Sequence, residues 1–137
     1  MLERPHIKAM DAEPDARRIL TAYARQVREV GARIAPLAEV VRAAAGLDEE
    51  IRALAEEGRV QRIRGMRVLA QRLADRGALK PGLTTAEAAD VLWLLNDPGV
   101  YYRLVIEQHW DPGRYQDWLA DSLISLLIPA SYQPETG

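Results

Sequence analysis

The chain has 137 residues, which is enough for one domain with a single hydrophobic core. Its net charge of −2 argues against a nucleic-acid-binding surface, because such a surface carries an excess of lysine and arginine. The absence of cysteine excludes disulfides and zinc–thiolate sites, and no apolar run approaches the ~20 residues that span a bilayer. We therefore expect a single cytoplasmic domain, residues 1–137, that does not insert into a membrane.

The first part of the chain is predicted to be helical, because Ala, Leu, Arg and Glu dominate and no alternating β-branched pattern occurs. A helix that begins near Pro14 carries one apolar stripe: Leu20, Tyr23, Val27, Val30 and Ile34. Pro36 lacks a backbone N–H and clashes with the preceding turn, so we expect a break or kink near Ala35. A short separate helix should follow and end at Gly46.

A long helix is predicted in the middle of the chain. Asp48 is a suitable N-cap for it, and it should reach about Arg76 and stop at Gly77. Gly58 and Gly65 lie inside this helix, where each costs ~1 kcal/mol relative to alanine. They mark either close packing or a bend.

Three further helix starts follow. Thr84 and Glu87 have the spacing of a capping box. An Asp-Pro pair occurs at residues 97–98 and again at 111–112, which places aspartate at the N-cap and proline at the first helical position. The final helix should end near Ile128. The sequence thus predicts an all-α bundle of six or seven helices.

Residues that carry catalysis are sparse in this sequence. The glycine-rich phosphate loops and the G-x-S-x-G nucleophile motif are absent, and the two histidines, His6 and His109, do not form the paired Glu-x-x-His motifs of a di-iron bundle. Asp90 lies on an apolar helix, where it either faces a ligand or meets an arginine at a groove edge. An enzyme that uses Asp90 or His109 remains an alternative, but the sequence predicts no catalytic site, no cofactor and no metal.

Tyrosine and tryptophan supply every large ring, since phenylalanine is absent, and their polar tips suit pockets and interfaces. Arg62 follows Arg59 by three residues on one helix face and either recognises an anionic ligand or lies on a solvated surface. Core packing is the alternative for each ring. The predicted pocket, for a small apolar or amphipathic ligand, consists of Tyr23, Val27, Arg62, Met66, Trp93 and Tyr101.

The final helix is apolar over more than the ~100° stripe that a surface helix needs. Such a helix is either central in its own chain or covered by a partner chain. We expect the second arrangement, a homodimer that pairs through the last long helices. The predicted interface consists of Tyr115, Trp118, Leu119, Ser122, Leu123 and Leu126.

Four segments follow a recurring pattern: GALKPGL (77–83), EAADVLW (87–93), DPGVY (97–101) and HWDPGRYQDWLADSL (109–123). Together they resemble the C-terminal ligand-binding and dimerisation domain of tetracycline-repressor-type (TetR family) bacterial transcription regulators. The resemblance extends back to residues 33–36 and so covers nearly the whole chain.

The resemblance implies a homodimeric sensing domain of a repressor, in which a ligand between the helices changes the spacing of two N-terminal DNA-reading heads. Residues 88–95 and 115–126 match the interface helices of the family. The residues before Pro14 are too few for a three-helix head, so we expect no direct DNA binding by this chain. The alternative from another class is a helical adaptor that pairs with a different protein and has no ligand pocket.

Overall fold

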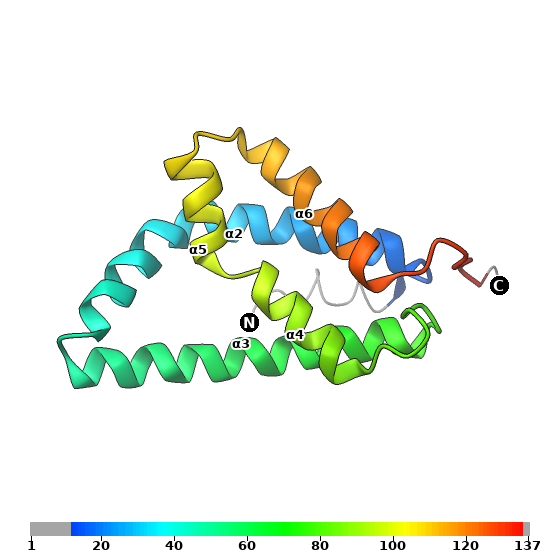
Figure 1. The fold of residues 1–137 in the computed structure, drawn as a ribbon, viewed down its shortest axis with the longest axis horizontal. Helices are drawn as coiled ribbons and strands as arrows, with labels where there is room; N and C mark the ends of the chain where they lie inside the picture. Colours follow the sequence, from blue (N-terminus) through cyan, green and yellow to red (C-terminus); the bar gives the residue numbers. More distant parts are fainter. Residues whose placement is uncertain (1–11, 136–137) are drawn as a thin grey trace.

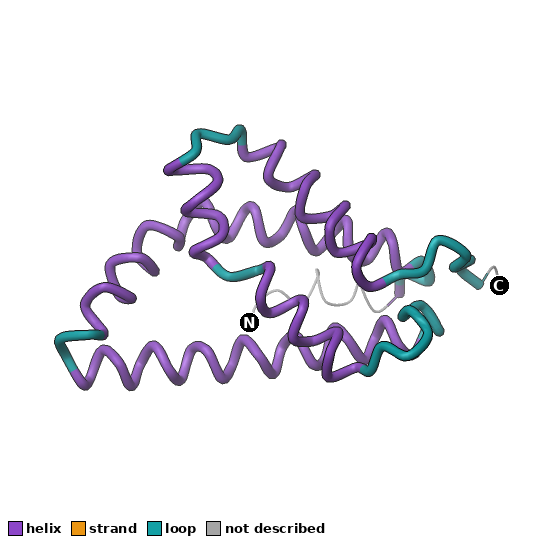
Figure 2. Tube along the Cα trace, viewed as in Figure 1, coloured by secondary structure: helices purple, strands orange, loops and turns teal. Residues whose placement is uncertain are grey.

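The computed structural model describes residues 12–135, and all regular secondary structure in this range is helical. Four helices have 11 to 30 residues: α2 (Ala16–Ala45), α3 (Glu49–Asp75), α4 (Thr85–Leu95) and α6 (Pro112–Leu127). The single turn of α5 (Pro98–Tyr101) runs directly into a π-helix, η1 (Tyr102–Glu107). Short loops join these elements (Figure 2). The all-α prediction is confirmed, and within the described range no helix is long and apolar enough to cross a membrane.

α2 is one helix where the sequence predicted two. Asp15 caps its start by accepting a hydrogen bond from the Arg17 N–H at 2.9 Å, and Gly46 follows its end. Pro36 lies inside the helix, and the axis of α2 turns sharply in its second half (Figure 1). A bend relieves the clash that proline makes with the preceding turn without ending the helix. The kink expected near Ala35 is therefore present, but the separate short helix is not.

The other helix starts are confirmed by their caps. The Asp48 carboxylate accepts hydrogen bonds from two backbone N–H groups of the first turn of α3. Thr84 and Glu87 form the reciprocal capping box at α4. Asp97 and Asp111 each accept from the N–H two residues further on, with proline at the first helical position. Local sequence signals thus determine where these helices begin.

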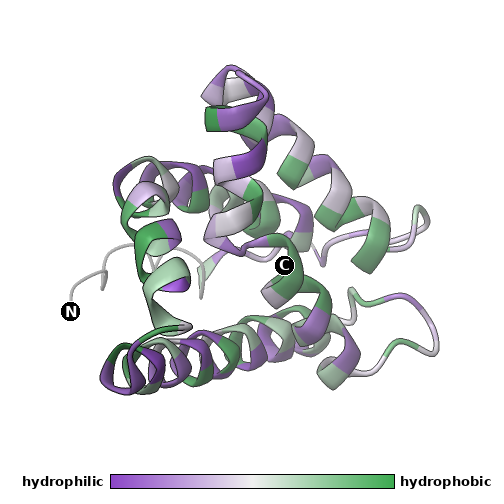
Figure 3. Cartoon of the chain, turned by 60° about the vertical axis from the view of Figure 1, so that its left-hand side comes forward, coloured by the Kyte–Doolittle hydropathy of each residue, from purple (hydrophilic) through white to green (hydrophobic). Residues whose placement is uncertain are grey.

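The hydrophobic core lies between α2, the second half of α3, α4 and α6. Helix α2 packs along α6, and α3 packs along α4 (Figure 1). Apolar and polar residues are interleaved along the helices, as expected where each buries one face (Figure 3). The largest fully buried side chains are Ile19, Leu20, Leu73, Leu92, Tyr115, Leu119, Leu123 and Leu127.

The second half of α2 and the first half of α3 form an arm that extends away from this core (Figure 1). Residues 36–65 contribute no buried side chain, and Leu47 at the tip of the arm is 92% exposed. Within residues 12–135, a methyl group added at Gly58 or Gly65 would meet no atom within 4 Å outside the adjacent helix backbone, and α3 is straight (Figure 1). The two glycines therefore mark neither close packing among the described residues nor a bend.

Tyr132 ties the segment after α6 to the start of α2. Its side chain is buried, and its hydroxyl accepts from the Ala16 N–H at 3.1 Å and donates to the Pro14 carbonyl at 3.2 Å. The Arg17 guanidinium lies 5.1 Å from the centroid of its ring. The hydrogen bond from the Ala16 N–H to the Tyr132 hydroxyl satisfies one of the free N–H groups in the first turn of α2.

Candidate functional site

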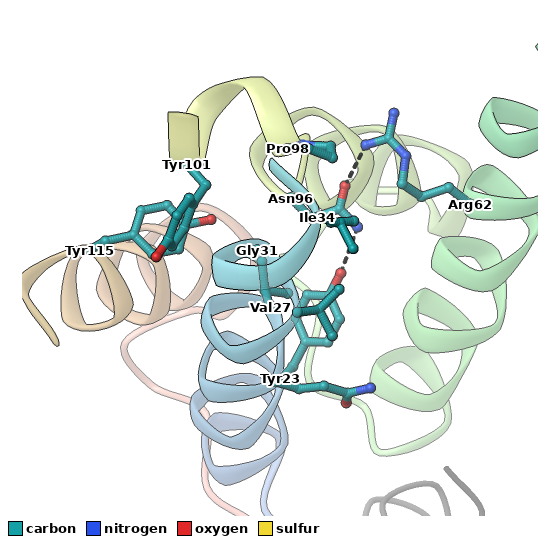
Figure 4. Close-up of a pocket in the computed structure, with 11 residues that line it drawn as sticks. Tyr23, Val27, Gly31, Ile34, Arg62, Asn96, Pro98, Tyr101 and Tyr115 are labelled. Atoms are coloured by element: carbon teal, nitrogen blue, oxygen red, sulfur yellow. Dashed lines mark hydrogen bonds between the residues drawn. The ribbon is translucent and has the colours of Figure 1, made fainter. Parts of the chain in front are cut away.

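A cavity of about 190 Å³ lies where α2 meets the junction of α4 with α5 and the start of α6 (Figure 4). α2 contributes one continuous face to it, with residues at spacings of three and four, so that the same stripe that predicts the helix forms the wall of the cavity. The lining consists of Tyr23, Gln26, Val27, Val30, Gly31, Ile34, Arg62, Asn96, Pro98, Tyr101 and Tyr115.

A polar network closes one side of the cavity. Arg62 of α3 donates to the Asn96 side-chain oxygen at 2.9 Å and to the Asp97 carboxylate at 3.2 Å. The Asn96 amide donates to the Tyr23 hydroxyl at 2.7 Å (Figure 4). That hydroxyl donates to the Met66 sulfur at 3.1 Å. Asn96 ends α4 and Asp97 caps α5, so the network holds the α4–α5 junction against α2 and α3.

The charge of Arg62 is balanced within the chain. Its guanidinium pairs with Asp97 and also lies 5.3 Å from the centroid of the Trp93 ring. The neighbouring Tyr23 remains protonated: burial raises the pKa of its hydroxyl to about 12, although the Asn96 hydrogen bond and the Arg62 charge lower it. This side of the cavity therefore presents satisfied, electrically balanced groups.

Tyr115 forms the opposite end of the cavity. Its side chain is fully buried, and its ring meets the Tyr101 ring edge-on at a centroid distance of 5.0 Å. The Tyr115 hydroxyl has no hydrogen-bond partner among residues 12–135. Burial raises the pKa of this hydroxyl above its usual value, so it keeps its proton. A buried donor without a partner costs ~1–3 kcal/mol, and Tyr115 is one of the residues that line the cavity.

Gly31 allows Tyr101 to reach this position. A Cβ atom at residue 31 would lie 2.9 Å from Cδ2 of the Tyr101 ring, which is closer than Cβ atoms approach other atoms in proteins. The ring packs directly on the backbone of α2, and any larger residue at this point would push Tyr101 away from Tyr115 (Figure 4). The glycine is thus needed for the shape of the cavity.

The structure brings together four of the six residues predicted for the pocket: Tyr23, Val27, Arg62 and Tyr101. Met66 and Trp93 lie outside the lining. Met66 is behind Tyr23 and accepts its hydroxyl proton, whereas Trp93 packs beside the Arg62 guanidinium. Helical spacing indicates the face on which a side chain lies but not its depth, so it does not separate Met66 and Trp93 from the residues that line this cavity.

Several lining residues were not predicted as such. Val30 and Ile34 belong to the predicted apolar stripe of α2 and are found by extending it past Val27. Asn96 directly precedes the Asp97-Pro98 helix start, and Pro98 belongs to it. Gln26, Gly31 and Tyr115 gave no such signal.

The residues predicted for the dimer interface differ in how far they are buried within the single chain. Tyr115, Leu119 and Leu123 are fully buried in the core of the single chain, because α6 packs this face against α2. This face of α6 is therefore central in its own chain. The pairing of two chains through the last helices stays a prediction. Trp118 and Ser122 are half-buried, and Leu126 is 50% exposed.

The residues of the enzyme alternative lie outside the cavity. Asp90 is exposed on α4, and His109 is exposed in the turn before α6, with a left-handed φ of 60°. No group of three or more potential metal ligands occurs within residues 12–135. Asp90 is therefore not the internal carboxylate that its apolar neighbours suggested.

Comparison with known proteins adds no assignment: no family model, no curated protein and no solved structure matches the chain. The function must therefore be inferred from the cavity and from the sequence motifs themselves.

Proposed function

We propose that the chain binds a small amphipathic molecule in this cavity and acts as the sensing and dimerisation domain of a TetR-like transcription regulator. The observation that carries the proposal is the cavity itself, which is bordered by α2, α3, the α4–α5 junction and α6. An apolar cavity of ~150 Å³ inside a protein is large enough to bind benzene. The volume of about 190 Å³ found here accommodates a somewhat larger ligand.

The position of the cavity suits a sensor. A ligand in the cavity touches Pro98 and Tyr101 in the segment that joins α4 to α6, and the Arg62–Asn96 hydrogen bond fixes that segment to α3. A ligand that favours one arrangement of this junction shifts the population towards it by its difference in affinity. An affinity ratio of ~10⁴ between two arrangements switches the population almost completely.

The dimerisation part of the proposal rests on apolar side chains that the chain leaves exposed on α4 and α6. Leu94 is 60% exposed and Leu126 is 50% exposed. Sedimentation equilibrium should give twice 15.3 kDa for the wild type. Leu126→Glu should give a folded monomer, whereas Leu47→Glu, at the tip of the arm, should remain dimeric. A folded wild-type monomer overturns this part of the proposal and leaves the cavity unaffected.

Ligand binding is tested by thermal shift and native mass spectrometry with a library of small aromatic and aliphatic molecules. Binding at 100 times Kd stabilises the folded state by ~2.7 kcal/mol. Val27→Trp fills the cavity and should abolish the stabilisation, whereas Val68→Trp, a substitution on the exposed side of α3, should preserve it. A library that stabilises neither the wild type nor the control contradicts the proposal.

A helical adaptor without a ligand is the second candidate, and the arm favours it. Leu37 and Leu54 on the arm are 63% and 66% exposed, and a partner helix would cover such side chains. The adaptor function is favoured if no library member stabilises the wild type and the chain is a folded monomer in the absence of a partner protein.

A further inference from the structure

We infer that the cavity selects an uncharged ligand whose apolar body carries one hydrogen-bond acceptor, such as a carbonyl oxygen, and that the Tyr115 hydroxyl donates a hydrogen bond to this acceptor. The inference rests on the proposed ligand-binding function and adds the chemical class of the ligand.

The polar groups of the lining differ in whether they are already used. The Tyr23 hydroxyl donates to the Met66 sulfur and accepts from Asn96. The Asn96 amide accepts from Arg62 through its oxygen, so both ends of this side chain are engaged. These groups have their partners within the chain and gain nothing from a ligand.

The Tyr115 hydroxyl is the lining group whose missing hydrogen bond a ligand would supply. It is fully buried, has no partner within residues 12–135, and its side chain points from α6 towards Gly31 at the end of the cavity (Figure 4). Burial keeps the proton on the phenol, so the unmet requirement is for an acceptor. The other two neutral polar side chains of the lining, Gln26 and Tyr101, can use water instead, because Gln26 is half-exposed and the Tyr101 hydroxyl is not a fully buried atom without a partner.

The charges around the cavity exclude an ionic ligand. An anion would need a free cation, but the Arg62 guanidinium is paired with Asp97. A cation would need a carboxylate in the lining, and none of the lining residues is acidic. Moving an unpaired charge into an apolar site is strongly unfavourable.

The remaining lining suits an apolar body. Val27, Val30 and Ile34 present aliphatic side chains from α2, and Pro98 and the Tyr101 ring also belong to the lining. A molecule with an aromatic or alicyclic ring suits this aliphatic and aromatic lining, with its acceptor directed at Tyr115.

Three probes of similar size test this chemistry: acetophenone, α-methylstyrene, in which CH₂ replaces the carbonyl oxygen, and benzoate. We measure the Kd of each by NMR titration against the wild type, Tyr115→Phe and Tyr102→Phe, the last being a half-buried tyrosine outside the lining. Acetophenone should bind the wild type about fivefold to tenfold more tightly than α-methylstyrene, the effect of one hydrogen bond to a buried donor. Benzoate should bind at least about tenfold more weakly than acetophenone.

The variants separate the possible outcomes. Tyr115→Phe should remove the preference for acetophenone, and Tyr102→Phe should keep it. Equal binding of acetophenone and α-methylstyrene by the wild type overturns the role of Tyr115, and tighter binding of benzoate overturns the uncharged class; either result leaves the cavity as a ligand site. Failure of all three probes to bind overturns the proposed ligand-binding function together with this inference.

Discussion

Two tyrosines of the cavity should respond in opposite ways to loss of their hydroxyl groups. The Tyr115 hydroxyl is buried without a partner, so Tyr115→Phe removes a desolvated polar group and no hydrogen bond. The Tyr23 hydroxyl has two partners, and Tyr23→Phe removes the Asn96 amide's acceptor at 2.7 Å and leaves it only the Met66 sulfur at 3.4 Å. The two substitutions remove the same atom from the same residue type and thus form a matched pair.

The magnitudes follow from the environments of the two hydroxyls. Removal of the unpaired hydroxyl in Tyr115→Phe should raise the free energy of unfolding of the ligand-free protein by about 1 kcal/mol. Removal of the paired hydroxyl in Tyr23→Phe should lower it by about 1–2 kcal/mol. For a domain of this size 1 kcal/mol corresponds to a shift in Tm of about 3–5 °C. Urea denaturation followed by circular dichroism gives both values from the transition midpoints at constant m.

The sign of the Tyr115 effect is the decisive result. If Tyr115→Phe destabilises the ligand-free protein as much as Tyr23→Phe does, the Tyr115 hydroxyl has a partner in the folded state. The cavity would then offer no unmet donor, and the inferred ligand chemistry would lose its basis. Stabilisation by Tyr115→Phe combined with weaker acetophenone binding would show that the wild type keeps a destabilising group for the sake of a ligand.

Three further effects follow from the structure. Gly31→Ala should lower the free energy of unfolding by about 1–3 kcal/mol and displace the Tyr101 ring, seen as changed aromatic NMR shifts; an unchanged urea midpoint contradicts the close contact. Gly58→Ala and Gly65→Ala should each raise the free energy of unfolding by about 0.5–1 kcal/mol in urea titrations, because nothing occupies the space beside them; destabilisation by either would reveal a hidden contact. Because the pKa of the Tyr23 hydroxyl is raised in the folded state, the unfolded chain loses the Tyr23 proton first as the pH rises. The contribution of Tyr23 to the free energy of unfolding is therefore present below pH 10 and is lost as the pH rises towards 12. Tyr23→Phe should flatten the fall of the urea midpoint between these pH values, and an equally steep fall would exclude Tyr23 as the source of that fall.

The fold was predictable from sequence wherever a short-range interaction decides the structure. The caps at Asp48, Thr84 and Asp97 involve atoms two or three residues apart, so their residue types are sufficient evidence. Pro36 was ambiguous because a proline ends a helix only if the following residues do not continue it. Here they do: residues 37–45 are rich in strong helix formers, and α2 bends instead of stopping.

The site was predictable only in part, because a pocket is defined by depth and by elements that meet in space. The spacing on α2 was sufficient for Tyr23 and Val27, which lie on the one stripe that faces inward. The same spacing on α3 and α4 selected Met66 and Trp93, which lie behind the lining. Tyr115 shows the limit most clearly, since an apolar helix face has the same pattern whether its own chain or a partner covers it.

The position of Tyr115 on α6 also connects the two halves of the proposed function. Tyr115, Leu119 and Leu123 form the buried face of this helix, and Trp118 and Leu126 lie on an adjacent face that is partly or largely exposed. A ligand that binds to the Tyr115 hydroxyl acts on a helix whose other side is the proposed dimer contact. α6 is a continuous helix of 16 residues, so we expect a shift at one face to displace the other. Linkage then requires reciprocity: if the ligand changes the dimerisation constant by some factor, dimerisation must change the ligand Kd by the same factor. The acetophenone Kd of the wild type should therefore differ from that of Leu126→Glu, although Leu126 lies outside the cavity, and identical values would mean that binding and association are independent.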